Sequence, residues 1–253
     1  MRKMKNKKLK AILSLSGYFL LILALCFVGG LVFHSYYYEL VYVSGTSMSP
    51  TLNGQADEKA GSVVDFGIVD KHQSAINHIE RFDIISTYYP YVEGKYENDY
   101  TADNVLKASA KMKIKRVIAL PGETFSIKDG LLCIKKDDEF VDVPYTFKIN
   151  LSEAHKNAKD ISEKHLEENE YWVLGDNRDS STDSAYLDKA IIKENIVGVL
   201  VAIEGKAQLK LKNYVCQTCG RVYKSGNTCS ECGGVLGPQY TLTNKQYHWP
   251  KYY

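Results

Sequence analysis

The chain has 253 residues, of which 45% are hydrophobic and 25% are charged; these proportions exclude a disordered protein and fit one sizeable domain with a small accessory module. The formal net charge is +2, but residues 1–10 hold six Lys and Arg, so the remainder carries 2 − 6 = −4. This balance argues against a basic nucleic-acid-binding domain, and we expect no nucleic-acid partner.

The first element is apolar. Residues 11–33 contain no charged side chain and are long enough to cross a bilayer as a helix, which takes about 20 residues. A cleaved signal peptide also begins with a basic region and an apolar run, but that run is usually ~7–15 residues. A retained transmembrane helix is therefore favoured. The basic residues 1–10 would stay cytoplasmic, and everything after about residue 34 would be extracytoplasmic. The sequence thus predicts a single-pass protein of the cell membrane, in contact with membrane lipid.

Beyond the apolar segment, short strand-like runs alternate with turn signals such as Asn53-Gly54, Pro121-Gly122 and Asp129-Gly130. The runs cover residues 36–43, 65–69, 82–88, 114–120, 131–134, 170–174 and 196–203. Such spacing predicts a mainly β, antiparallel architecture. Residues 54–62 are polar and predict a loop, whereas residues 150–170 are highly charged and predict a helical or mobile insertion.

Three stretches carry the chemistry, at residues 44–52, 114–123 and 175–184. Taken singly, each has an ordinary interpretation as a turn, an exposed basic pair or a structural loop. Taken together, they offer a serine hydroxyl, a strand lysine and a dense polar loop. Burial lowers the pKa of a lysine, and its neutral amine can then take the proton of a serine hydroxyl. A hydroxyl from Ser181 could hold that amine in position.

In this order, and after one apolar N-terminal segment, the three stretches resemble the bacterial type I signal peptidases, which use a Ser-Lys dyad. The resemblance covers about residues 10–205 and includes Arg81-Phe82-Asp83-Ile84-Ile85, similar to a short strand motif of that family. It implies that Ser47 is the nucleophile, Lys115 the general base and Ser181 the lysine-orienting residue. The Ser47 backbone N–H would contribute to the oxyanion hole. The supporting loop would contain Asp176, Asn177, Arg178 and Asp183.

The resemblance also implies fold, substrate and place of action. The catalytic domain would be an antiparallel β-sheet structure without a catalytic cofactor. It would cleave signal peptides from secretory precursors at the outer membrane surface, near the Sec translocon, and would bind them as an added extended strand with small side chains near the cut.

Two positions depart from the family pattern. Gly45 stands two residues before the nucleophile, where some members have a serine whose hydroxyl helps the oxyanion hole, so a second donor is unassigned. Ala185 follows Ser184 where the family usually has arginine. We therefore expect the ion pair of that arginine with an aspartate such as Asp183 to be missing.

The C-terminal region carries four cysteines in two Cys-x-x-Cys pairs, each followed by glycine: Cys216, Cys219, Cys229 and Cys232. Four thiolates suit a closed, tetrahedral structural zinc site. Two disulfides are the alternative, because the predicted extracytoplasmic location permits them. The spacing favours a small zinc ribbon. Cys26 and Cys133 are interpreted as apolar core residues rather than ligands.

The predicted organisation is a basic N-terminus (1–10), a transmembrane helix (11–33), a signal-peptidase-like catalytic domain (34–205) and a zinc-ribbon-like module (206–253). The leading functional hypothesis is a membrane-anchored serine endopeptidase, signal peptidase I. Two alternatives stay open: a specialised relative that processes one secretion, spore or pilus substrate, and a catalytically weakened scaffold that recruits partners through its zinc ribbon.

Overall fold

The structure is a computed structural model that describes residues 2–55, 57, 59–89, 110, 112–128, 131–144 and 160–252, without the side chains of residues 2–16 and 34–35. The chain divides into two compact units, Met1–Glu39 and Leu40–Tyr253. The predicted turn at Asp129-Gly130 and residues 150–159 of the predicted insertion lie outside the described residues.

The first unit is the helix α1 (Arg2–Tyr37), whose sequence contains no proline to interrupt it. Its large apolar side chains between Tyr18 and Phe33 are exposed. Among the residues whose placement is described, no helix combines the length and the apolar character needed to cross a bilayer. The predicted transmembrane helix is therefore not confirmed.

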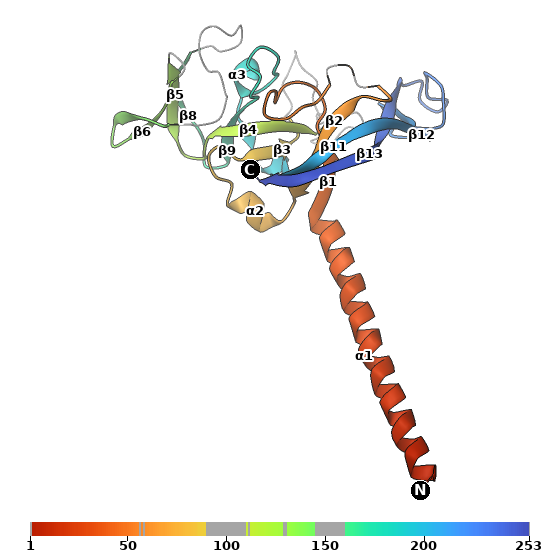
Figure 1. Cartoon of the computed structure of the whole chain (residues 1–253). Coiled ribbons are helices and arrows are strands. Elements are labelled where there is room, and N and C mark those ends of the chain that lie inside the picture. The colour runs from red at the N-terminus through yellow and green to blue at the C-terminus, as the bar shows by residue number, and fades with distance from the viewer. Residues whose placement is uncertain are drawn as a thin grey trace. The chain divides into compact units, whose positions relative to one another are not determined.

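The second unit is built on a large sheet in the order β1-β2-β11-β3-β4-β9-β10, with β12 and β13 also paired to β11 (Figure 1). From β2 to β10 each pairing along this order is antiparallel, which confirms the predicted mainly β fold. The strands are β1 (Tyr38–Tyr42), β2 (Val63–Asp70), β3 (Ile84–Thr87), β4 (Lys113–Ala119), β9 (Glu170–Leu174), β10 (Ile191–Ile192), β11 (Ile196–Cys216), β12 (Val222–Tyr223) and β13 (Leu236–Tyr252).

A smaller antiparallel sheet has the order β7-β6-β5-β8. Its strands are β5 (Thr124–Lys128), β6 (Leu131–Lys136), β7 (Glu139–Asp142) and β8 (Ile161–His165). The short helices are α2 (Gln73–Asn77), α3 (Ser184–Leu187) and the 3-10 turn η1 (Lys193–Asn195). Strand β8 corrects the prediction of a helical or mobile insertion over 150–170. Its side chains are mostly exposed, so the sequence lacks the apolar alternation of a half-buried strand.

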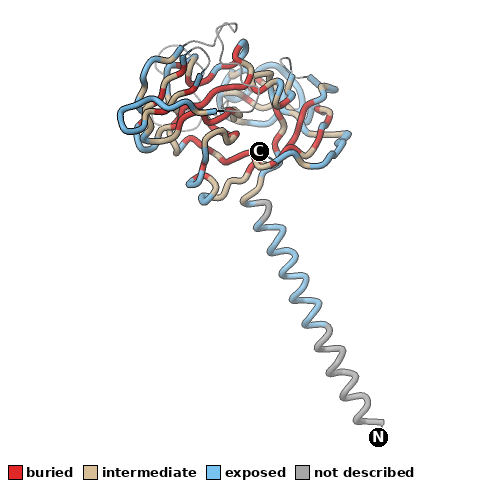
Figure 2. The backbone as a smooth tube through the Cα atoms, turned by 60° about the vertical axis from the view of Figure 1, so that its left-hand side comes forward, coloured by how far each residue is buried: buried red, intermediate tan, exposed pale blue. Residues whose placement is uncertain are grey.

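Buried residues run through the body of the second unit (Figure 2). One core cluster is contributed by several strands and by the loop after β1: Val41, Val43, Met48, Leu52, Val69, Ile84, Leu200 and Ile203. Met48 directly follows the predicted nucleophile and is 1% exposed. This packing fixes the backbone of the nucleophile loop against the sheet.

Strand β11 is longer than the predicted run 196–203 and continues to Cys216. It crosses the predicted domain boundary at residue 205 without interruption, with β2 pairing to residues 199–208 and β13 to residues 202–216. The four cysteines are therefore connected to the large sheet by a continuous strand. The predicted boundaries themselves stay predictions.

Candidate active site

The structure brings Ser47 and Lys115 into direct contact. The amine Nζ of Lys115 lies 2.8 Å from the hydroxyl Oγ of Ser47 and 2.9 Å from the carbonyl oxygen of Ile114. Lys115 comes from β4 and Ser47 from the loop after β1, 68 residues earlier in the chain. The distance suits a hydrogen bond in either direction, so a neutral amine could accept the serine proton.

Lys115 is 3% exposed, although it carries an ionisable amine. The pKa of Lys115 is lowered from 10.5 to about 8, and burial is the largest cause. The positive charges of Lys113 and Arg178 contribute to this shift, whereas the negative charges of Asp183 and Asp176 oppose it. The desolvated amine therefore loses its proton far more readily than an exposed lysine does. A substantial neutral fraction near pH 8 is what a general base requires.

The loop that carries Ser47 is held by the residues that directly follow the serine. Met48 and Leu52 are buried beneath it, and Leu52 donates a backbone hydrogen bond to the Met48 carbonyl. Further along, Asn53 donates its backbone N–H and side-chain amide to one carboxylate oxygen of Asp65 in β2, at 2.8 and 3.2 Å. Ser47 is thus positioned by a rigid scaffold.

The loop at residues 175–184 contacts the backbone of Thr46 and Ser47. Asn177 donates its backbone N–H to the Ser47 carbonyl at 2.9 Å and its side-chain amide to the Thr46 carbonyl at 3.0 Å. A Cβ on Gly175 would lie 2.2 Å from Ser181 Oγ and 2.4 Å from the Ser47 carbonyl oxygen, so only glycine fits there. Two of the three sequence stretches are therefore joined by direct hydrogen bonds.

Arg178 and Asp183 form a buried ion pair inside this loop, through Nη1 and Oδ2. The same Asp183 oxygen accepts the Gly175 N–H at 3.0 Å, and the second oxygen caps helix α3 by accepting the N–H of Tyr186. The sequence predicted that an ion pair of Asp183 with the family's arginine would be missing, because Ala185 stands in the place of that arginine. Arg178 supplies a cation for Asp183 from within the loop instead.

Ser181 is buried, but its hydroxyl has no hydrogen-bond partner among the described residues. The predicted hydrogen bond from Ser181 to Lys115 is therefore not seen. An unsatisfied buried hydroxyl costs about 1–3 kcal/mol. The Ser181 hydroxyl lies close to the Ser47 carbonyl oxygen, because a Cβ on Gly175 would contact both of these atoms.

The predicted set of site residues did not include Arg116, which follows Lys115 on β4. Its guanidinium binds the Asp176 carboxylate in two contacts of 2.9 and 2.7 Å, and both side chains are buried. It also donates to the Phe82 carbonyl at 2.9 Å. Strand alternation is the sequence signal that could have identified Arg116. Adjacent residues of a strand point to opposite faces, so a buried Lys115 places Arg116 on the other face of β4, where it is buried as well.

Gly45 has a φ of +71°, in the left-handed region that glycine adopts without strain. A serine at this position would be strained, which is a physical reason for the departure from the family pattern. Among the described residues, no hydrogen bond uses the Ser47 backbone N–H. That donor is therefore free to face a substrate carbonyl.

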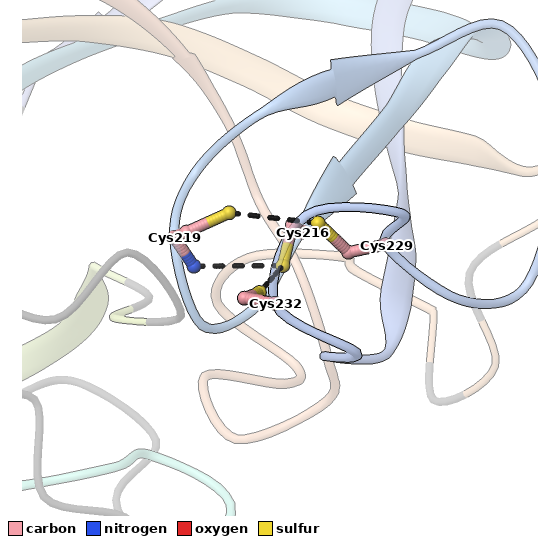
Figure 3. A group of neighbouring side chains, drawn as sticks. All are labelled: Cys216, Cys219, Cys229 and Cys232. Atoms are coloured by element: carbon pink, nitrogen blue, oxygen red, sulfur yellow. Dashed lines mark hydrogen bonds between the residues drawn. The ribbon is translucent and has the colours of Figure 1, made fainter.

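The four predicted cysteine ligands converge at the end of the β11–β13 hairpin (Figure 3). Their sulfurs lie within 4.8 Å of one another, and two pairs, Cys216 with Cys232 and Cys219 with Cys229, are 3.5 and 3.7 Å apart. Four sulfurs at about 2.3 Å from a tetrahedral zinc ion would be about 3.8 Å apart, whereas a disulfide needs about 2.05 Å. All four are free thiols, and their geometry fits a zinc ion.

A serine hydroxyl in contact with a buried, readily deprotonated amine provides the nucleophile and the general base that a serine hydrolase needs. The family model for signal peptidase, peptidase S26, matches residues 15–204. The chain therefore belongs to the signal peptidase family, peptidase S26.

Its curated relatives include Signal peptidase I U of Bacillus subtilis (strain 168), which is 30% identical over 182 residues, 71% of this chain and 79% of the relative. Signal peptidase I of Bacillus licheniformis is 29% identical over 176 residues, 66% of this chain and 77% of the relative. A crystal structure of a signal peptidase I from Enterococcus faecalis V583 is 27% identical and covers 48% of this chain and 96% of that chain, with a TM-score of 0.33. A TM-score at this level does not establish a shared fold.

Proposed function

We propose that this chain is a signal peptidase I, a serine endopeptidase that removes N-terminal signal peptides from exported precursor proteins. Membership of the signal peptidase family supports the reaction. The observation that carries the proposal is the 2.8 Å contact between Ser47 Oγ and the buried amine of Lys115. The reaction needs no catalytic cofactor, because the dyad supplies both nucleophile and base.

In the first half-reaction, neutral Lys115 takes the hydroxyl proton as Ser47 Oγ attacks the carbonyl carbon of the scissile peptide bond. The negative charge that develops on the carbonyl oxygen is stabilised by the Ser47 backbone N–H. The tetrahedral intermediate collapses when the C–N bond breaks, and protonated Lys115 gives its proton to the leaving amine of the mature protein. An acyl-enzyme ester on Ser47 remains.

In the second half-reaction, Lys115 deprotonates a water molecule that attacks the ester carbon. The C–O bond to Ser47 breaks, the serine oxygen recovers its proton from Lys115, and the signal peptide leaves as a carboxylic acid. Asn177 acts as a positioning residue in both halves, since it holds the carbonyl groups of Thr46 and Ser47. Ser181 is proposed to orient the Lys115 amine when substrate completes the site.

The substrate is proposed to bind as an extended strand with small side chains near the cut, by resemblance to the family. Precursors emerging at the outer membrane surface near the translocon would then reach the site. Three features support a membrane anchor at residues 11–33: the absence of charge, the basic residues before it and the exposed apolar side chains of its described part. Side chains before residue 17 lie outside the described part of this helix.

The C-terminal cysteines are proposed to hold one structural zinc ion. Cys216, Cys219, Cys229 and Cys232 would supply four thiolates, and the ion would fix the far end of the β11–β13 hairpin. The ion would play no part in the peptidase reaction, because it would be bound outside residues 15–204, the stretch that matches the family.

The alternative of a catalytically weakened scaffold is not favoured, because the buried Ser47–Lys115 contact is intact. A specialised relative with one substrate would use the same dyad, so only a survey of precursors distinguishes it from a general signal peptidase.

The test is cleavage of a purified secretory precursor by the full chain in lipid vesicles. Ser47→Ala and Lys115→Ala are expected to abolish cleavage while keeping the far-ultraviolet spectrum of the parent. Ser49→Ala is the matched control, because Ser49 lies in the same loop and its hydroxyl contacts only the Leu52 carbonyl among the described residues. Cleavage by Lys115→Ala at the parent rate would refute the dyad.

A further inference from the structure

The C-terminal half of β13 exposes three large aromatic side chains on a strand that the peptidase family does not account for. Tyr247, Trp249 and Tyr252 are 64%, 92% and 78% exposed, although tryptophan is highly buried on average. The family match ends at residue 204. We call residues 245–252 the aromatic segment.

A bulge directs Trp249 away from the sheet. Tyr247 pairs with Gly205 and Lys251 with Ile203, so four steps along β13 oppose two steps along β11, and two extra residues are accommodated between them. Pro250 suits a bulge because it has no N–H to donate. The ring nitrogen Nδ1 of His248 lies 2.7 Å from the Trp249 carbonyl oxygen. Bulges commonly re-aim a side chain, and this one presents Trp249 to the surroundings.

The start of the segment is fixed to the core. The Tyr247 ring meets the buried Phe66 ring of β2 edge-on, with centroids 5.3 Å apart, and the Lys245 amine lies 5.6 Å from the Phe66 centroid. The exposed aromatics therefore extend from a preformed strand rather than from a frayed end.

The charge of this region is positive, which favours an anionic partner. Residues 236–253 contain no Asp or Glu, whereas Lys245 and Lys251 lie among the exposed aromatics, on either side of Tyr247 and Trp249. Lysine is depleted in protein–protein interfaces. Trp, Tyr and Lys together are typical of the headgroup level of a bilayer, where amphipathic rings and long cationic side chains keep their polar ends in water. We propose that the aromatic segment binds the anionic headgroup region of the membrane.

The position of the segment agrees with this partner. The C-terminal end of β13 pairs with β11 at Ala202, and β2, the neighbour of β1 in the sheet, pairs with the same residue of β11. Leu40 follows Phe33 by seven residues, which span at most about 25 Å. This step rests on the membrane anchor proposed above. The segment would be a second, lipid-dependent contact that fixes how the catalytic domain faces the bilayer.

The two tryptophans of the chain allow a direct test. Trp172 is buried, so the difference in emission between the full chain and its Trp249→Phe variant reports Trp249 alone. Both proteins are reconstituted in vesicles of anionic or zwitterionic lipids whose acyl chains are brominated near the headgroup. Trp249 emission should move to shorter wavelength and be quenched in anionic vesicles, and Lys245→Gln with Lys251→Gln should weaken the quenching. Unquenched, long-wavelength Trp249 emission in both lipids would overturn the proposal.

Cleavage of a precursor by the protein in the same vesicles tests the proposed peptidase function separately from the lipid contact of Trp249. Unquenched Trp249 in vesicles that still cleave precursor refutes the lipid contact alone, whereas loss of cleavage by the parent chain refutes the peptidase assignment. Quenching in anionic lipid together with unchanged cleavage of a short soluble peptide by Trp249→Phe supports a membrane-positioning role. Protection of Trp249 only when a protein partner is added would show that the segment binds protein instead.

Discussion

Lys115 shows at the scale of one residue how catalysis and stability oppose each other. Its pKa in the folded chain, about 8, lies below the ordinary 10.5, so the unfolded chain binds the proton more tightly. The resulting destabilisation is complete below pH 8 and disappears as the pH rises towards 10.5. We expect Lys115→Met to raise the free energy of unfolding at pH 7 by roughly 3 kcal/mol, since one pKa unit corresponds to about 1.4 kcal/mol.

Urea denaturation at several pH values measures this effect. The stability of the parent should rise between pH 8 and 10 relative to that of Lys115→Met. Equal stability of the two proteins at pH 7 would mean that the buried amine is accommodated without cost.

Lys113 offers a prediction on pH dependence. It lies two residues before Lys115 on β4, its amine is 5.3 Å from the Tyr89 ring centroid, and its charge lowers the pKa of Lys115. The rate should increase as the pH rises through about 8, because the base acts in its neutral form. Removing a like charge should raise the pKa of Lys115, so Lys113→Met is expected to move the ascending limb of kcat/KM to higher pH.

Lys113→Arg is the matched control, because it keeps the charge and should keep the limb in place. Asp183 and Asp176 act on Lys115 in the opposite sense, and Arg178 in the same sense as Lys113. An unmoved limb in Lys113→Met would remove Lys113 from the tuning of the base.

At the scale of elements, strand β4 and the polar loop are joined by the buried ion pair of Arg116 with Asp176. Arg116→Met would leave a buried carboxylate without its cation, which commonly costs about 3–5 kcal/mol. Arg221→Met is the control, because the pair of Arg221 with Glu231 is exposed and such pairs contribute about 0–1 kcal/mol. Chemical denaturation should separate the two variants clearly; similar losses in both would contradict the structural role of Arg116.

The elements also show what the sequence could predict. Runs such as 170–174 are apolar and bounded by turns, so β9 was found with its limits. Strand β13 was not, because its polar, mostly exposed side chains lack the apolar pattern of a core strand. The extension of β11 was missed although Ala207 and Leu209 are buried and alternate with polar residues, as in a half-buried strand. Within the site, the motifs predicted that Ser47 and Lys115 would meet. No local pattern predicts that Asn177 would contact two backbone carbonyls or that Arg116 would pair with Asp176. These contacts join residues far apart in the sequence, so they depend on the three-dimensional fold.

At the scale of the whole molecule, the cysteine cluster is connected to the large sheet through β11 and β13. Purified protein is expected to contain one zinc ion per chain, by elemental analysis, and Cys216→Ser should lose it because a closed site needs all four ligands. Cys133→Ser is the control, since Cys133 lies on β6, outside this cluster.

Hydrogen exchange locates the effect of the ion. A chelator should accelerate exchange in residues 208–216 and 236–243 more than in β4. Exchange that is unchanged by the chelator, or zinc retained by Cys216→Ser, would contradict a structural zinc site.

The proposed function depends most on Ser47 as the nucleophile of a lysine-assisted peptidase. The direct measurement is mass spectrometry of the full chain in vesicles after treatment with an acylating lactam-type inhibitor. We predict a covalent adduct on the peptide that contains Ser47, with no adduct in Ser47→Ala and a strongly reduced rate of labelling in Lys115→Ala. An adduct on another residue, or no adduct in folded protein that cleaves precursor, would contradict the assignment.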